Sequence, residues 1–192
     1  MSVEAGSLLP PPPLRERRWI PAIALVALIV GVVSGGHALS GALAETHAGA
    51  IAVGDSVEID PLPGWELAGR FEDPTGIRLT SGSASLDVAT LPFGGADVDL
   101  LREYVDGVLA AQAEQLRLSQ QVGPVRLDSG LTGSRIAYVG VFGDVQTPVE
   151  GEITAVVSPT GTGIVFDAWA PSGQLRMALD DLHAMIERAA LA

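Results

Sequence analysis

The chain has 192 residues and a formal net charge of −12, and all eleven of its Lys/Arg positions are arginine. The first 40 residues carry a net charge of +1 and the remainder carries −13, so the acidity belongs to the C-terminal part. This charge argues against nucleic-acid binding, which needs Lys and Arg to neutralise phosphates. The absence of cysteine and lysine excludes disulfides, thiol nucleophiles, thiolate metal sites and a Schiff-base lysine.

The N-terminal segment predicts a single membrane-spanning helix. Residues 1–18 form a tail with a four-proline run and three arginines, and residues 19–39 read WIPAIALVALIVGVVSGGHAL. A helix of about 20 apolar residues covers about 30 Å, the hydrocarbon thickness of one bilayer. The arginines precede this span and no Lys or Arg follows it until Arg70, so the positive-inside rule predicts a cytoplasmic N-terminus and an extracytoplasmic C-terminal domain in the cell membrane.

A cleaved secretory signal is the alternative to this signal anchor. Ala42-Leu43-Ala44 matches an A-x-A cleavage site, directly before Glu45. The long leader and the stretch between Ser34 and Ala44 favour the anchor, and both interpretations place the domain in the same compartment. Residues 40–54 are rich in Gly and Ala and predict a tether.

Residues 55–192 predict one α+β domain. Turn signals separate short apolar runs that indicate strands at 56–59, 65–71, 77–80 and 84–91. A helix is expected from an N-cap at Asp97 to about Leu118, and strands then follow at 122–127, 135–142, 149–158 and 164–170. Ser172 is expected to cap a terminal amphipathic helix. This order predicts an antiparallel β-sheet of about seven or eight strands with two packed helices.

Several short motifs along the domain resemble those of a known group of proteins. The motifs are the Pro63-Gly64-Trp65 turn, the helix from Leu100 to Leu116, Val149-Glu150-Gly151-Glu152, and Ala168-Trp169-Ala170-Pro171 before a final helix with Met185-Ile186. Together they resemble actinobacterial membrane-anchored proteins of uncharacterised function with PsbP-like or LpqN-like α/β/α sandwich domains. The resemblance covers about residues 57–189. It implies an envelope-facing domain that binds or scaffolds, with no catalytic residues to carry over.

Three aromatic residues are candidates for a ligand-binding cleft. Trp65 and Trp169 lie in predicted strands, and Tyr104 lies on the intervening helix. If their faces converge, they could line a cleft for a lipid, glycan or peptide. The alternative is that all three are ordinary core residues.

Carboxylates are the plentiful reactive groups of the domain. Glu150 and Glu152 are two residues apart and would share one face of a strand, as a glycosidase pair or a cation site requires. The alternative interpretation is that Glu150 and Glu152 lie at a polar, solvent-facing end of the strand. His183 is the single histidine of the domain and is expected on a solvated helix face. The sequence therefore predicts no catalytic residues, no metal site and no cofactor.

These features predict a non-enzymatic, membrane-anchored domain of the cell envelope that binds a partner protein or an apolar or lipid ligand. A carboxylate-dependent hydrolase acting on wall glycans through Glu150 and Glu152 is one alternative. An accessory subunit of a membrane secretion or transport complex is another, in which Gly31, Gly35 and Gly36 of the span would allow close helix approach. The oligomeric state is left open.

Overall fold

The computed structural model describes residues 49–143 and 145–191. The tail, the membrane span and most of the tether that the sequence predicts lie outside these residues. Within the described part, no helix combines the length and the apolar composition that crossing a bilayer would require.

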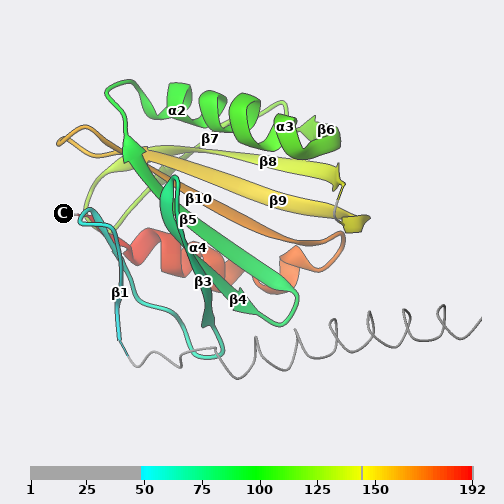
Figure 1. The fold of residues 1–192 in the computed structure, drawn as a ribbon. Coiled ribbons are helices and arrows are strands. Elements are labelled where there is room, and N and C mark those ends of the chain that lie inside the picture. Colours follow the sequence, from blue (N-terminus) through cyan, green and yellow to red (C-terminus); the bar gives the residue numbers. More distant parts are fainter. Residues whose placement is uncertain (1–48, 144, 192) are drawn as a thin grey trace, which may run out of the picture. The chain divides into compact units, whose positions relative to one another are not determined.

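One large antiparallel sheet organises the domain (Figure 1). Its strands run in the order β3–β4–β5–β10–β9–β8–β6, and β7 also pairs with β8. The strands span Glu66–Glu72 (β3), Thr75–Ser81 (β4), Ala84–Pro92 (β5), Ala113–Leu118 (β6), Gly123–Arg126 (β7), Thr132–Phe142 (β8), Val145–Val157 (β9) and Thr162–Pro171 (β10). The predicted α+β class with a sheet of about eight antiparallel strands is therefore confirmed.

Helices cover the two faces of this sheet (Figure 1). One face carries a continuous helical segment made of α2 (Asp97–Tyr104), one π-helical turn η1 (Val105–Leu109) and α3 (Ala110–Gln112). The other face carries α4 (Leu179–Arg188), preceded by the 3-10 turn η2 (Leu175–Met177). The layers are therefore helix, sheet and helix.

A small second sheet joins the two ends of the described chain. It contains β1 (Ile51–Val53), β2 (Val57–Ile59) and β11 (Ala190–Leu191). The apolar residues of β1 and β2 are buried, and they belong to the same core as α4. Residues 51–53, which the sequence assigned to the tether, are therefore part of the folded domain.

Two hydrophobic cores lie on opposite faces of the sheet, and β10 contributes to both. Ile164, Phe166 and Ala168 join the α4-side core, whereas Val165 and Trp169 pack into the α2-side core. This division follows the alternation of side chains along a strand. A strand buried on both faces reads as a continuous apolar run, as β10 does from Gly163 to Ala170 except at Asp167.

The end of the first helix differs from the sequence-based prediction. The helix ends at Gln112, and Ala113 has extended backbone angles (φ −86°, ψ 131°). Residues 113–118 then form β6, which pairs with residues 138–142 of β8. The prediction of helix as far as Leu118 was wrong because pairing with the edge of β8 overrides the helical propensity of this stretch.

The predicted helix caps also differ in detail. The N-cap of α2 is Ala96, and Asp97 is the first helical residue, whose carboxylate accepts a hydrogen bond from Ser134 Oγ (2.8 Å). Ser172 does not cap the terminal helix, because η2 comes first and α4 begins after Ala178 without a side-chain cap.

Candidate functional site

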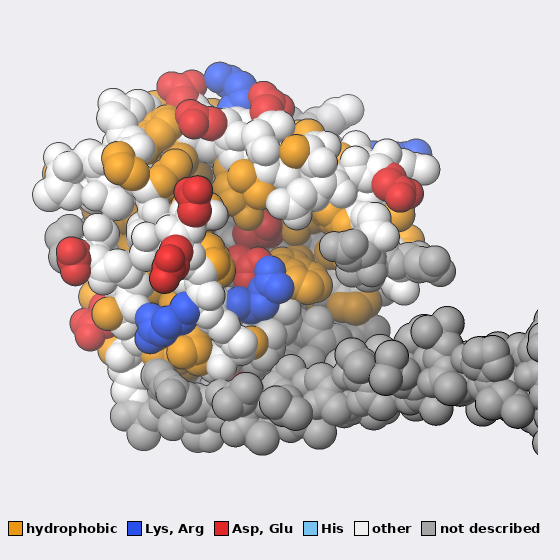
Figure 2. Space-filling view, in the orientation of Figure 1, with side chains coloured by type: hydrophobic (Ala, Val, Ile, Leu, Met, Phe, Trp, Pro, Cys, Tyr) orange, Lys and Arg blue, Asp and Glu red, His pale blue; other side chains and the backbone are white. Residues whose placement is uncertain are grey.

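A pocket of about 450 Å³ lies between the α2–α3 segment and the sheet. Figure 2 shows a hollow on this face in which acidic and arginine side chains lie among hydrophobic ones. The β3–β4 turn contributes Asp73 and Pro74 to the lining. The apolar lining residues are Phe71, Ala89, Val108, Leu109, Phe142, Val149 and Val165. The pocket is therefore largely apolar with a few polar groups.

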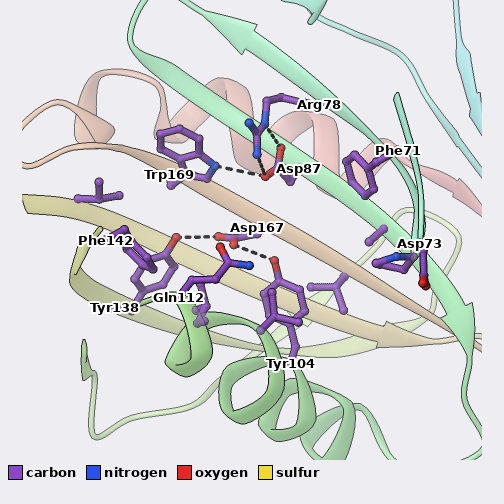
Figure 3. A pocket seen from close by; sticks show the side chains of 16 residues that line it. Phe71, Asp73, Arg78, Asp87, Tyr104, Gln112, Tyr138, Phe142, Asp167 and Trp169 are labelled. Atoms are coloured by element: carbon purple, nitrogen blue, oxygen red, sulfur yellow. Dashed lines mark hydrogen bonds and ion pairs between the residues drawn. The ribbon is translucent and has the colours of Figure 1, made fainter. Parts of the chain in front are cut away.

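Asp167 is the most buried carboxylate of this pocket. It lies in the middle of β10 and is only 4% exposed. Its two carboxylate oxygens accept hydrogen bonds from Tyr138 Oη (2.9 Å) and Tyr104 Oη (3.0 Å), as Figure 3 shows. The two tyrosines come from β8 and from the end of α2, so the carboxylate ties the helix to the sheet.

A second carboxylate, Asp87, lies directly across from Asp167 on β5. Arg78 of β4 donates two hydrogen bonds to it, from Nε (2.6 Å) and Nη2 (2.7 Å). Trp169 Nε1 also lies 3.5 Å from Asp87 Oδ2, and the Arg78 guanidinium lies 5.5 Å from the centre of the Trp169 ring. Figure 3 shows this group beside the Asp167 group. The bidentate pair engages both oxygens of Asp87, and among the described residues no arginine side chain hydrogen-bonds Asp167.

The protonation of the pocket groups follows from this arrangement. Burial, and then repulsion from Asp87, raises the pKa of Asp167 to about 7, although the hydrogen bonds from the two tyrosines and the charge of Arg78 act in the opposite direction. Burial and the neighbouring Asp167 raise the pKa of both Tyr104 and Tyr138, so both phenols stay protonated and act as donors. Hydrogen bonding to Asp87 raises the pKa of Arg78.

Gly151 makes room for Tyr138. The two residues are cross-strand partners on β9 and β8. A Cβ atom on Gly151 would overlap the Tyr138 ring. The glycine of the Glu150-Gly151-Glu152 motif is therefore needed so that Tyr138 can lie flat on β9 and reach Asp167.

The π-helical turn η1 lies where the helix passes over the pocket. It follows Tyr104 directly and contributes Val108 and Leu109 to the lining, and Gln112 of α3 completes this wall. Such wide turns occur mostly as single insertions in α-helices and are frequent at functional sites.

The structure brings together two of the three predicted aromatic residues. Tyr104 and Trp169 both line the pocket. Trp65 does not join them: it packs into the α4-side core, and its Nε1 lies 3.4 Å from Asp181 Oδ2 of α4. The prediction that all three could converge depended on which face each strand residue occupies, and Trp65 occupies the other core.

Glu150 and Glu152 lie outside this pocket and contact the segment that follows β10. Glu150 Oε1 accepts hydrogen bonds from the backbone N–H groups of Gly173 (2.8 Å) and Leu175 (3.0 Å). Glu152 Oε2 lies 2.7 Å from His183 Nε2, and the same ring nitrogen lies 3.0 Å from Arg135 Nη1. His183 therefore links α4 to the sheet through a partly buried polar cluster, where the sequence suggested a solvated helix face.

Sequence reasoning missed Asp167, Asp87 and Arg78. A usable signal was present, because Asp167 interrupts the apolar run Ile164–Ala170 and Asp87 is the one charged residue of the predicted strand 84–91. A carboxylate inside a strand buried on both faces needs a partner or a function.

No arrangement of three or more metal-binding side chains occurs among residues 49–143 and 145–191. Asp73, Asp87 and Asp167 all line the pocket, but Asp87 is engaged by Arg78 and Asp167 by two tyrosine donors. A metal ion would have to displace these donors to gain several oxygen ligands.

Comparison with known proteins supports the fold. No protein-family model and no curated protein matches the chain in sequence. Among solved structures, the chain is similar to cyanobacterial PsbP (CyanoP) from Synechocystis sp. PCC 6803, with a TM-score of 0.51 and 14% identity over 77% of this chain and 95% of that one. It is also similar to LpqN, described as involved in cell envelope biogenesis of Mycobacterium tuberculosis, with a TM-score of 0.50 and 16% identity over 74% of this chain and 89% of that one. The domain thus has a PsbP-like and LpqN-like fold.

Proposed function

We propose that this chain is a membrane-anchored, extracytoplasmic domain of the cell envelope that binds a small ligand in the pocket between α2–α3 and the sheet. The observation that carries this proposal is the pocket itself, which has aromatic and aliphatic walls and a polar floor. The floor is formed by Arg78, Asp87, Tyr104, Tyr138 and Asp167. Small-molecule sites usually measure about 300–1,000 Å³ and combine apolar walls with a few fixed polar groups. The pocket has both properties.

The envelope location rests on two supports. The N-terminal sequence has the features of a signal anchor with the positive-inside bias. The fold is shared with LpqN, whose description places that protein in cell envelope biogenesis. Fractionation of cells that express the full chain with a C-terminal tag tests the anchor: we expect full-length protein in the membrane fraction, with the tag accessible to protease from outside. A shortened soluble product would show a cleaved signal.

The proposed role is binding without catalysis. Glu150 is occupied by two backbone amides and Glu152 by His183, so the carboxylates suggested for a wall-glycan hydrolase each have a structural partner. We expect no wall-degrading activity from the purified chain. Activity that Glu152→Gln abolishes would instead support the hydrolase.

Ligand binding is tested by identifying the compounds that co-purify with the protein. The full chain is purified, denatured and extracted with organic solvent, and the extract is analysed by mass spectrometry. We expect a compound that co-purifies with the wild type and is lost from Val108→Trp, which fills the pocket from η1.

The matched control is Val98→Trp, the same change on the same helical segment at a position that is 38% exposed and outside the pocket. Equal carriage by both variants would mean that the compound binds elsewhere. An extract without any specific compound would favour a protein-binding module over a ligand carrier.

A further inference from the structure

The floor of the pocket has an excess of negative charge. Asp87 and Asp167 face each other across β5 and β10, and among the described lining residues Arg78 is the only cationic side chain. Arg78 already donates two hydrogen bonds to Asp87. An ionised Asp167 therefore has no cation to balance it, and it lies at a position that is almost inaccessible to water.

The hydrogen bonds of Asp167 leave the floor rich in acceptors. Tyr104 and Tyr138 each use their single hydroxyl proton to bind the carboxylate. Each phenol oxygen keeps its lone pairs, and each carboxylate oxygen can accept a further hydrogen bond. A ligand group with several donors would suit this floor better than an acceptor.

The walls suit an apolar body and reject an anion. Phe71, Phe142, Val149 and Val165 offer no charge. The acidic residues would repel an anion, and Arg78 is already paired with Asp87. The surrounding domain is itself strongly acidic.

We propose that the pocket binds a ligand with a protonated amine head group and an apolar body, and that the ammonium group sits on Asp167. An ammonium group brings three donors and one positive charge, which match the free acceptors and the missing countercharge. This inference rests on the proposed ligand-binding function and names the chemical class of the ligand.

Binding of an amine by this site depends on pH. The groups that face Asp167 are Tyr104 from α2, Tyr138 from β8, Asp87 from β5 and Arg78 from β4, while its β9 partner is apolar Ile153. With its pKa near 7, Asp167 is largely protonated at pH 5.5 and ionised at pH 8.5, whereas an alkylamine stays charged throughout. Amine affinity therefore rises with pH across this range.

Three probes with similar bodies test the head group. The full chain in phosphatidylcholine nanodiscs is titrated with 2-phenylethylamine, 2-phenylethanol and 3-phenylpropionate, with empty discs as the blank. At pH 8 we expect the amine to bind roughly tenfold to a hundredfold more tightly than the alcohol, as a charge-assisted hydrogen bond predicts. The carboxylate should bind most weakly.

Two carboxylate variants locate the head group. Asp167→Asn should reduce amine affinity to that of the alcohol and remove the pH dependence, because it removes the charge that pairs with the ammonium group. Asp106→Asn removes the same charge from an exposed position of η1 and should change amine affinity less than about twofold, because exposed charges are screened. The probe series on the wild type still tests the amine head group if Asp167→Asn does not fold.

The outcomes separate this inference from the proposed function. Equal or tighter binding of the alcohol or the carboxylate overturns the amine inference and leaves a ligand pocket that Val108→Trp should still block. Absence of binding by all three probes, together with a co-purified compound that lacks an amine, also overturns it. Absence of both probe binding and any co-purified compound overturns the proposed function itself.

Discussion

At the scale of single residues, Asp167 links stability to pH. Its pKa rises from 3.8 to about 7 on folding, because burial and Asp87 disfavour the charge. The native state therefore binds more protons than the unfolded state between about pH 4 and pH 7, and stability falls as pH rises through this window. Full ionisation of Asp167 should lower the free energy of unfolding by an amount on the order of 4 kcal/mol.

Asp167→Asn should isolate this contribution. We expect the free energy of unfolding of the wild type to fall relative to that of Asp167→Asn between pH 4 and pH 8, and the difference to level off above pH 8. Urea denaturation followed by tryptophan fluorescence measures both. Parallel pH profiles would show that Asp167 does not resist ionisation in the folded state.

Gly151→Ala tests the close approach of Tyr138 to β9. The added methyl group overlaps the Tyr138 ring, so the ring must shift and its hydrogen bond to Asp167 is disturbed. We expect a loss of roughly 1–3 kcal/mol in the free energy of unfolding, the usual cost of overpacking. Gly123→Ala on β7 is the control, because a Cβ there meets nothing within 4 Å. Equal effects of the two substitutions would argue against the steric explanation.

At the scale of elements, α4 is held to the sheet by its buried apolar face. Leu182 is fully buried and Leu179 only partly so. Leu182→Ala should therefore cost about 2–5 kcal/mol in the free energy of unfolding, and Leu179→Ala less than half as much. Because α4 lies on the face opposite the pocket, neither variant should change probe affinity at a temperature where it remains folded. Thermal denaturation and probe titration check the two expectations.

The sequence predicted the start of the α2–α3 segment better than its end. Its apolar periodicity predicted the helix, and Leu101 and Val105 lie on its buried face. Its end at Gln112 was not predictable, because residues 113–118 contain no Gly or Pro and favour helix locally. Pairing with β8, a partner distant in sequence, decided their conformation.

At the scale of the whole molecule, net charge opposes compactness. The residues after Ser40 carry −13, so repulsion among them destabilises the folded domain at low ionic strength. Raising NaCl from about 20 mM to about 500 mM shortens the Debye length from about 20 Å to about 4 Å and should raise the melting temperature by a few degrees at pH 7.5. A melting temperature that falls with salt at pH 7.5 would contradict this explanation.

The sequence by itself determined the fold class, most of the strands and the burial of both helices, because alternation and helical periodicity are local patterns that record which face is apolar. It also identified Tyr104 and Trp169 as candidates, since large amphipathic aromatics are common in pockets. Only the tertiary structure decided that Trp65 lies in the other core and that β6 replaces the end of a helix. It alone showed that Asp87 and Asp167 meet across two strands that are far apart in the chain. Cross-strand pairing sets these relations, and no local pattern encodes which strands become neighbours.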